Sequence, residues 1–391
     1  MRRKDWIIFV GDLSISYSRG ILRGMAQFIE SRPSLQRYAA YHVDIRELPR
    51  LETRDIAGAL IGGLSDRPSI AGKLAKWRIP KVDVAGDQHL PWLPWCVRVD
   101  DNAIGQAAAA YLIERGFHRL AYLGHDRHLA MARRQQSFTA ALEAAGRTVE
   151  CFQGSTERVG RRWWPPGMLA WIKQVEKPAA VFCCNDFRAS ALLVACRRAG
   201  IRVPEDIAVL GVDDDDLFAQ LQGRAISTVP VPTFTIAARA MDMLATLIHG
   251  LKPPRKLVQV PPQPIITRAS TDVMAVTDEL VRDGLAYLRE HFARGVSIKQ
   301  MVVDLAVSRP TLDKRFMAAL GRTPAGEVRR LQLEKTKALL VATELPMPRV
   351  ALQGGFSSAQ QMSVSFRRFV GTTPTQYRNA YSVRRQRGLD I

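Results

Sequence analysis

The chain has 391 residues, more than one ordinary domain needs and enough for two or three. Hydrophobic residues make up 47% and charged residues 24%, which excludes a chain that is disordered throughout. The formal net charge of +19 indicates an anionic partner, most simply nucleic acid, although residues 277–391, with 19 Lys and Arg against 10 Asp and Glu, carry less than half of it.

From Asp5 to about Ser270, short apolar runs alternate with amphipathic segments. The runs predicted as strands are Trp6–Val10, Ile56–Ile61, Lys81–Ala85, Leu120–Leu123, Ala179–Cys184 and Ile207–Val212. The segments predicted as helices are Ser18–Glu30, Ile104–Arg115, Ala132–Ala145, Arg188–Ala199 and Thr235–His249. Each run is apolar at successive positions, as in a strand that is covered on both faces. The alternation therefore predicts an α/β domain with parallel sheets over residues 1–270.

Polar residues that follow these runs form a predicted binding site. Asp12, Asn185 and Asp213 each come soon after a strand, at the sheet edge where ligands bind in open α/β folds. Their oxygens and the guanidinium of Arg134 can hold several hydroxyl groups at once, which is what a sugar presents. Tyr17 can cover an apolar ring face. A polar residue at the end of a strand often caps the next helix instead, and this alternative stays open for each of them.

Residues 271–276 form a predicted linker, after which the pattern becomes helical. The all-α region over residues 277–391 contains an internal repeat with an offset of 50 positions. The repeated residues are Ser308, Phe316, Gly321, Thr323 and Pro324, which recur as Ser358, Phe366, Gly371, Thr373 and Pro374. Identities in a single register predict two similar structural units in tandem.

Each repeat is predicted to contain a helix-turn-helix, at about residues 297–318 and 346–369. Its second helix has an apolar face, on which Leu312 and Phe316 lie in the first copy, and a polar face that can enter the major groove of double-stranded DNA. The residues predicted to contact DNA are Arg309, Thr311, Lys314, Ser358, Gln360, Gln361 and Arg367. Arginine can bond guanine and glutamine can bond adenine through base edges. A helical bundle with a solvated charged face is the alternative.

Several classes of protein are excluded because their motifs are missing. The five cysteines show no pairing framework and no zinc spacing, so we expect free thiols in a reducing compartment and no metal site. The sequence has no Walker A loop, no GxGxxG after a strand, no HExxH and no GxSxG, which predicts that the protein is not an enzyme and needs no cofactor. No apolar stretch is long enough to cross a membrane, and the first run is too short for a secretory signal. We therefore expect a cytoplasmic protein.

The N-terminal part resembles the LacI/GalR-type sensor domains, which are two-lobed relatives of the type I periplasmic binding proteins. The matching motifs are Asp101-Asn102, Arg133-Arg134-x-x-x-Phe138, Ala180-Val181-Phe182-x-x-Asn185-Asp186, Gly200-Ile201-x-Val203-Pro204 and Gly211-Val212-Asp213-Asp214. The resemblance implies that Arg134, Asn185 and Asp213 contact the effector. It also implies that Asp12, Tyr17 and Asp101 complete a pocket between the two lobes.

The C-terminal part resembles the AraC family of regulators. The match begins at Ser308 in the first repeat and continues through Gly371-x-Thr373-Pro374-x-x-Tyr377-Arg378 in the second. It departs at Gln332, where the family usually has Arg, and at Gln361-Met362, where it usually has an aromatic pair. The resemblance implies a transcription regulator with two DNA-reading helix-turn-helix units.

A LacI-type sensor joined to an AraC-type reader implies a homodimer that activates pentose-catabolism genes. The expected effector is a small sugar, D-xylose first, and the expected partners are promoter DNA at the nucleoid and RNA polymerase. A regulator of the same build that senses a non-pentose ligand, or that represses, stays open as the alternative. A purely extracytoplasmic sugar-binding protein is disfavoured because it would lack the DNA-reading repeat.

Overall fold

The apolar runs form parallel sheets in the computed structural model, which describes residues 6–43, 54–63, 68–86, 90–124, 128–153, 167–215, 226–272, 278–292 and 295–381. Among these residues, one sheet has six strands in the order β11-β5-β4-β3-β1-β2, and the other has five in the order β10-β9-β8-β6-β7. The first sheet contains β1 (Trp6–Val10), β2 (Ala39–Val43), β3 (Ile56–Ile61), β4 (Lys81–Asp83), β5 (Cys96–Val99) and β11 (Leu257–Val260). The second contains β6 (Arg119–Gly124), β7 (Val149–Gln153), β8 (Ala179–Cys183), β9 (Ile207–Asp213) and β10 (Ser227–Pro230).

The central strands are buried on both faces, as the continuous apolar runs predict. All six residues of β3 and all five of β8 are buried. Strand β1 lies between β2 and β3, with Phe9 aligned to His42 on one side and Leu60 on the other. Burial of such runs under helices is the main favourable contribution to the stability of a parallel sheet. The predicted α/β architecture is confirmed.

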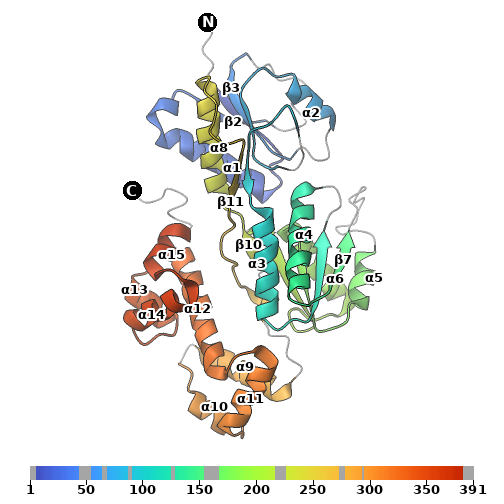
Figure 1. Ribbon diagram of the computed structural model, residues 1–391, viewed down its shortest axis with the longest axis vertical. Helices are drawn as coiled ribbons and strands as arrows, with labels where there is room; N and C mark the ends of the chain where they lie inside the picture. Colours follow the sequence, from blue (N-terminus) through green and yellow to red (C-terminus); the bar gives the residue numbers. More distant parts are fainter. Residues whose placement is uncertain are drawn as a thin grey trace. The chain divides into compact units, whose positions relative to one another are not determined.

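Helices cover both sheets (Figure 1). They are α1 (Ser16–Ser31), α2 (Pro68–Ala75), α3 (Asp101–Glu114), α4 (Leu129–Ala144), α5 (Met168–Gln174), α6 (Asp186–Ala199) and α8 (Thr233–Ile248), with short 3₁₀ turns at Pro33–Leu35 and Ala269–Thr271. Helices α1 and α8 lie side by side on the first sheet. Gly24 permits this close packing, because a Cβ there would lie 2.7 Å from the Cβ of Ala237.

The chain passes between the two sheets after β5, after β10 and after β11. After β11 it is tied to the second sheet by backbone hydrogen bonds between Thr228 and Ile266, at 3.1 and 3.0 Å. The hydroxyl of Ser270 then donates to the carbonyl of Val209 at 2.6 Å. Each sheet with its helices therefore forms one lobe, and three passages of the chain connect the lobes.

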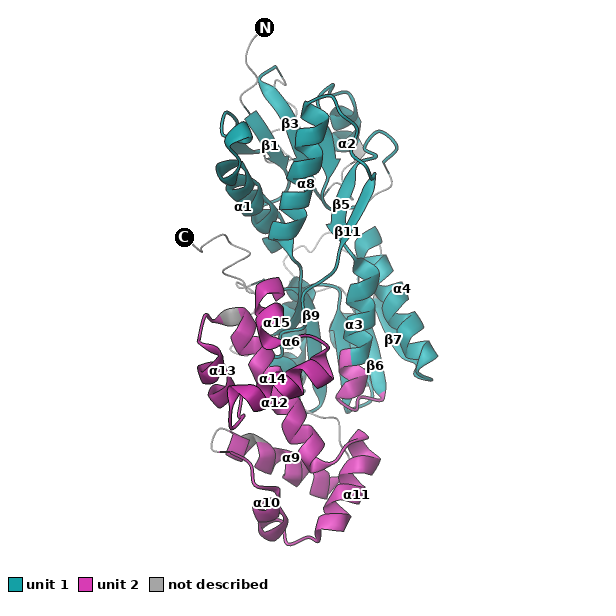
Figure 2. Cartoon of the chain, turned by 60° about the vertical axis from the view of Figure 1, so that its left-hand side comes forward, with its two compact units in different colours: residues 1–110, 119–271 teal, residues 111–118, 272–391 magenta. Residues whose placement is uncertain are grey.

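The chain as a whole divides into two units (Figure 2). Residues 1–110 and 119–271, which contain both lobes, form what we call the sensor unit. Residues 111–118 and 272–391 form the helical unit. Helix α3 therefore begins in the sensor unit, and its last turn belongs to the helical unit. Most of the predicted linker, residues 273–276, lies outside the described residues.

The helical unit has two apolar cores, one for each sequence repeat. Its helices are α9 (Glu279–His291), α10 (Ile298–Asp304), α11 (Arg309–Leu320), α12 (Pro324–Ala342), α13 (Met347–Gln353), α14 (Ala359–Val370) and α15 (Pro374–Tyr381). Phe316 is fully buried in the first core and Phe366 in the second. Gly321 and Gly371 end α11 and α14 with φ of 66° and 83°, which explains why glycine recurs there. Within the described residues, no helix has the length and hydropathy that crossing a bilayer requires.

A glycine sets the distance between α3 and α4 in the second lobe. A Cβ on Gly105 would lie 2.1 Å from Ser137 Oγ and 2.5 Å from the carbonyl oxygen of Arg134. Both neighbours belong to α4, and one of them is the backbone of the predicted effector residue Arg134. The two helices can therefore touch only because this position has no side chain.

We predict that Gly105→Ala lowers the free energy of unfolding by about 1–3 kcal/mol, because the added methyl forces α3 away from α4. Gly72→Ala is the matched control, since a Cβ on this glycine in α2 would meet nothing within 4 Å. Alanine there should be neutral or stabilising by up to about 1 kcal/mol. Denaturant unfolding of both variants checks the prediction. Equal stability of the two variants would contradict it.

Candidate effector and DNA-binding sites

A buried carboxylate at the start of α3 is the centre of the first candidate site. Asp101 is 1% exposed and accepts hydrogen bonds from Arg98 Nη1 and from Arg134 Nε, each at 3.0 Å. Arg133 Nε lies 3.4 Å from the same carboxylate. Burial of a carboxylate without cationic partners would cost several kcal/mol. These arginines are therefore what allows Asp101 to lie inside the sensor.

Arg134 connects Asp101 to the second sheet. It is buried on α4, and its Nη1 donates to the carbonyl of Cys184, directly after β8, at 2.7 Å. Burial disfavours the charged form, but the carboxylates of Asp101 and Asp213 outweigh burial and raise the pKa of Arg134 above its usual value. Three of the predicted effector residues, Asp101, Arg134 and Asp213, are thus close enough to interact electrostatically.

Asp213 occupies the end of β9 in an unusual backbone conformation. Its φ is 107°, a region that residues other than glycine rarely adopt and that is found mainly at functional sites. Burial raises the pKa of its carboxyl to about 7; Arg134 opposes this rise and Asp215 adds to it. Near neutral pH this carboxyl can therefore both donate and accept hydrogen bonds.

Asp186, in the first turn of α6, supports the loop that follows β9. It accepts hydrogen bonds from Thr228 Oγ1 at 2.9 Å and from the backbone amide of Asp215 at 2.8 Å. Burial, and then Asp213, raise the pKa of Asp186 well above its usual value. Gly211 is required beside it, because a Cβ there would lie 2.0 Å from Asp186 Oδ1. Asp186 thus positions the segment that carries Asp213.

The other predicted effector residues also make local contacts. The Oδ1 of Asn185 accepts the backbone amide three residues on, at 2.9 Å, and caps α6. The Oδ1 of Asp12 accepts the amide two residues on, also at 2.9 Å, just after β1. The Tyr17 hydroxyl donates to the carbonyl of Val84, directly after β4. The capping role that the sequence left open is therefore present in Asn185.

The sequence prediction missed several arginines. Arg19 on α1 lies 3.5 Å from Asp215, which follows β9, so this ion pair joins the two lobes. Arg98 and Arg133 were also missed, although both contact Asp101. Arg98 stands three residues before Asp101, and Arg133 belongs to the motif Arg133-Arg134-x-x-x-Phe138, in which only Arg134 was assigned a role. A lone arginine on a strand or helix has no motif that marks it as part of a site.

The second candidate site consists of α11 and α14, the second helices of the two helix-turn-helix units. Each begins at a serine whose Oγ accepts a backbone amide: Ser308 from Thr311 at 3.3 Å, and Ser358 from Gln361 at 3.1 Å. Ser358, predicted as a DNA contact, is therefore the N-cap of α14. The same cap in both copies explains why serine recurs in the repeat.

The outer faces of these helices carry the other residues predicted to read DNA. Thr311, Lys314, Gln360 and Arg367 are exposed. Arg309 is exposed too, but its Nε bonds both carboxylate oxygens of Asp313, at 3.0 and 2.9 Å.

Gln361 is also engaged in a contact inside the unit. Its Oε1 accepts from the backbone amide of Ser357 at 3.0 Å and from the Ser357 hydroxyl at 2.9 Å. Gln332, the departure from the AraC pattern, donates through Nε2 to the carbonyl of Gly355, in the turn between α13 and α14. Both glutamines therefore stabilise the second helix-turn-helix.

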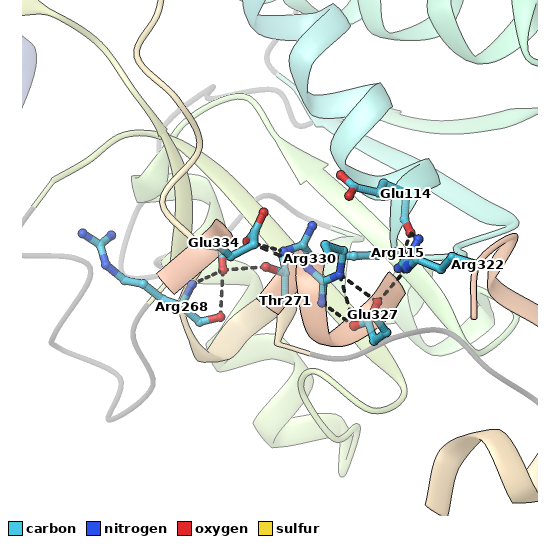
Figure 3. A network of polar contacts seen from close by, with 9 residues as sticks. Glu114, Arg115, Arg268, Thr271, Arg322, Glu327, Arg330 and Glu334 are labelled. Atoms are coloured by element: carbon cyan, nitrogen blue, oxygen red, sulfur yellow. Dashed lines mark hydrogen bonds and ion pairs between the residues drawn. The ribbon is translucent and has the colours of Figure 1, made fainter. Parts of the chain in front are cut away.

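Helix α12 carries a network of ion pairs that includes the last turn of α3 (Figure 3). Glu327, which is 1% exposed, contacts Arg322 at 2.6 Å and Arg330 at 2.7 Å. Burial alone would raise the pKa of Glu327, but these arginines outweigh it and lower the pKa. Arg115, 2% exposed, contacts Glu334 at 3.0 Å. Arg322, just before α12, also donates to the backbone carbonyl of Glu114 at 3.1 Å, so α12 and the turn before it both contact the end of α3.

We predict that Glu334→Gln lowers the free energy of unfolding of the helical unit by about 1–3 kcal/mol, because it removes the carboxylate charge opposite a buried guanidinium. Asp242→Asn is the control, since Asp242 and its partner Arg32 are 50% and 55% exposed. A pair so exposed to water contributes little. Thermal unfolding compares the two. An unchanged Tm for Glu334→Gln would show that the network adds no stability.

We predict that Asp213→Asn raises the Tm, and raises it more at pH 8 than at pH 5. The pKa of Asp213 is raised to about 7 from 3.8, so the folded state keeps a proton between these values that the unfolded state has lost. Stability therefore falls as the pH rises from about 4 to 7, by on the order of 4 kcal/mol, and asparagine removes this loss. Asp206→Asn is the control of opposite sign, because Arg202 lowers the pKa of Asp206. Parallel Tm changes in the two variants would contradict the assignment.

Comparisons with known proteins find matches to two kinds of domain in the chain. Residues 109–271 match the family model of the periplasmic binding protein-like domain, and residues 301–380 match that of a helix-turn-helix domain. The xylose operon regulatory protein of Escherichia coli strain K12 is 27% identical over 379 residues, which cover 94% of this chain and 95% of that protein. Its counterpart in Haemophilus influenzae is 24% identical over 372 residues, which cover 93% and 95%.

A solved structure described as the xylose-binding transcription activator xylR shares the fold. It matches with a TM-score of 0.59 and 24% sequence identity, and the match covers 96% of this chain and 98% of that one. The likeness to these regulators includes both the parallel sheets and the helix-turn-helix units. The chain is therefore not an enzyme but a DNA-binding transcription regulator, in which a periplasmic binding protein-like sensor precedes a C-terminal helix-turn-helix domain.

Proposed function

We propose that the protein is a transcription activator that responds to D-xylose. In this proposal it acts as a homodimer on double-stranded promoter DNA, in the cytoplasm at the nucleoid, and contacts RNA polymerase. The names of its relatives support xylose as the effector, because the likeness to the xylose operon regulatory proteins extends over 94% of the chain. The observation that carries the sensor assignment is the buried Asp101–Arg134 pair beside Asp213.

The proposed effector contacts are Asp12, Tyr17, Asp101, Arg134, Asn185 and Asp213. Their chemistry suits a sugar, because carboxylates accept hydrogen bonds from hydroxyl groups and a guanidinium donates to ring and hydroxyl oxygens. The pKa of Asp213, about 7, lets this carboxyl serve as donor or acceptor. A sugar offers both kinds of group at neighbouring carbons. Asp101 and Arg134 are also buried, and the low local dielectric strengthens the polar contacts between them.

For DNA, we assign base reading to Thr311, Lys314, Gln360 and Arg367. Ser358 and Gln361 support the start of α14, and Arg309 holds Asp313 on α11. In each copy the helix-turn-helix would place its second helix in the major groove, and the two would meet the DNA about one helical turn, roughly 34 Å, apart.

Sugar binding is proposed to act by a population shift. The sugar bridges the two lobes. It thereby favours one of two arrangements of the homodimer, the one in which the helix-turn-helix units fit the promoter. A difference of a few kcal/mol between the two arrangements is enough to switch occupancy.

We predict that D-xylose stabilises the full-length protein, by about 2.7 kcal/mol at 100 times its dissociation constant. Thermal-shift measurements with D-xylose, L-arabinose, D-ribose and D-glucose test this. Asn185→Ser is the matched variant, because serine keeps the cap of α6 but lacks the amide group. Its Tm without sugar should stay near that of the natural protein. Its affinity for sugar should fall by about tenfold, as expected for the loss of one or two hydrogen bonds.

The outcomes separate the parts of the proposal. A shift with another sugar and none with D-xylose would keep the sensor and change its ligand. No shift with any sugar would overturn the effector assignment and leave the DNA-binding assignment standing. Full sugar affinity in Asn185→Ser would remove Asn185 from the site.

A further inference from the structure

An exposed valine lies in the middle of the face that α14 turns toward solvent. Val364 is 65% exposed. It stands four residues after Gln360 and three before Arg367, so these side chains form one stripe along the helix. Met362 and Phe366 are fully buried on the other side. An apolar residue on a surface is common; what distinguishes Val364 is its place between the two residues assigned to base reading.

The internal repeat gives each position of α14 a counterpart in α11, 50 residues earlier. The buried positions keep their apolar character, since Leu312 corresponds to Met362 and both are fully buried. The outer stripe differs. Lys314, also exposed, is the counterpart of Val364. The central position of the stripe is thus a cation in one helix and a branched apolar side chain in the other.

These two side chains suit different base edges. In the major groove, guanine presents the acceptors O6 and N7, which a lysine ammonium can bond. Thymine presents a C5-methyl group, which only an apolar side chain can pack against without leaving a polar group unsatisfied. Adenine presents N7 and an amino group, which match the amide of glutamine. Gln360, one turn before Val364, is exposed and suited to such an adenine.

We propose that α14 reads a thymine through contact of Val364 with its C5-methyl group, next to an adenine that Gln360 bonds, whereas α11 reads a guanine through Lys314. This inference rests on the proposed DNA-binding function and adds the bases that it selects. The two halves of the site then differ in base composition. The protein binds its promoter in one orientation, although its reading helices descend from one repeated unit.

The experiment uses the full-length protein and a duplex that it selects from a random 40-base-pair library in the presence of D-xylose. Each thymine of the selected duplex is replaced in turn by deoxyuridine, which removes only the methyl group. Affinity is measured at one fixed salt concentration, because phosphate contacts depend strongly on salt. At one or two positions in the α14 half, deoxyuridine should weaken binding by about fourfold, the equivalent of one buried methyl group.

Substitutions at Val364 assign that effect to its side chain. Val364→Ala should bind the thymine and deoxyuridine duplexes almost equally. Val364→Lys, which copies Lys314, should shift selection toward guanine in the same half. Leu352→Ala is the control, since Leu352 on α13 is 66% exposed and belongs to neither stripe. This control should keep the fourfold difference.

Two results would overturn the inference. One is a duplex in which no thymine is sensitive to the loss of its methyl group. The other is a Val364→Ala protein that still distinguishes thymine from deoxyuridine. Failure to select any duplex is a different result, because it would overturn the DNA-binding function itself.

Discussion

The sensor depends on one buried carboxylate. Asp101 stands at the point where the chain leaves β5 of the first lobe and begins α3 of the second, and it is almost without contact with water. Arg98 approaches it from the strand, while Arg133 and Arg134 approach from α4. Loss of Arg134 would leave this carboxylate with less compensation for its removal from water, and loss of Asp101 would do the same to the buried guanidinium of Arg134. The proposed effector site is therefore built from the same charges that hold the connection between the lobes.

The helical unit shows how one structural unit can be copied and then altered. Both copies keep a serine cap, a buried phenylalanine and a glycine with positive φ at the end of the second helix. These features determine the backbone, so each copy folds in the same way. The outer face has no such constraint, because side chains that point to solvent add little to stability. Its residues can therefore differ between the copies according to what each helix contacts. The difference between Lys314 and Val364 lies on that face.

Much of the fold could be predicted from periodicity. The predicted strands correspond to β1, β3, β4, β6, β8 and β9. The missed strands β2, β7, β10 and β11 lie at the edges of the two sheets, where continuous apolar runs are not needed. The short interior strand β5 was also missed, because Arg98 interrupts its apolar run. For the site, strand ends pointed to Asp213 and Asn185, but not to Arg98, Arg133 or Arg19. Ion pairs between distant segments leave no local pattern, and a capping residue such as Asn185 or Ser358 has the same signature whether or not it also binds a ligand.

Helix α3 belongs to both units, and this affects how such a regulator can be taken apart. Its first turn carries Asp101, while Arg115 directly follows its last residue and contacts Glu334 of α12. From the sequence, residue 271 is the obvious place to join the sensor of one regulator to the DNA-binding domain of another, because the strands end there and only helices follow. Such a join would give the DNA reader a foreign α3 and remove a buried guanidinium that its own α12 is built to receive. A chimaera that exchanges the sensor should therefore keep residues 111–118 together with the DNA-binding domain. Alternatively, the new sensor should have an arginine at the position that corresponds to Arg115.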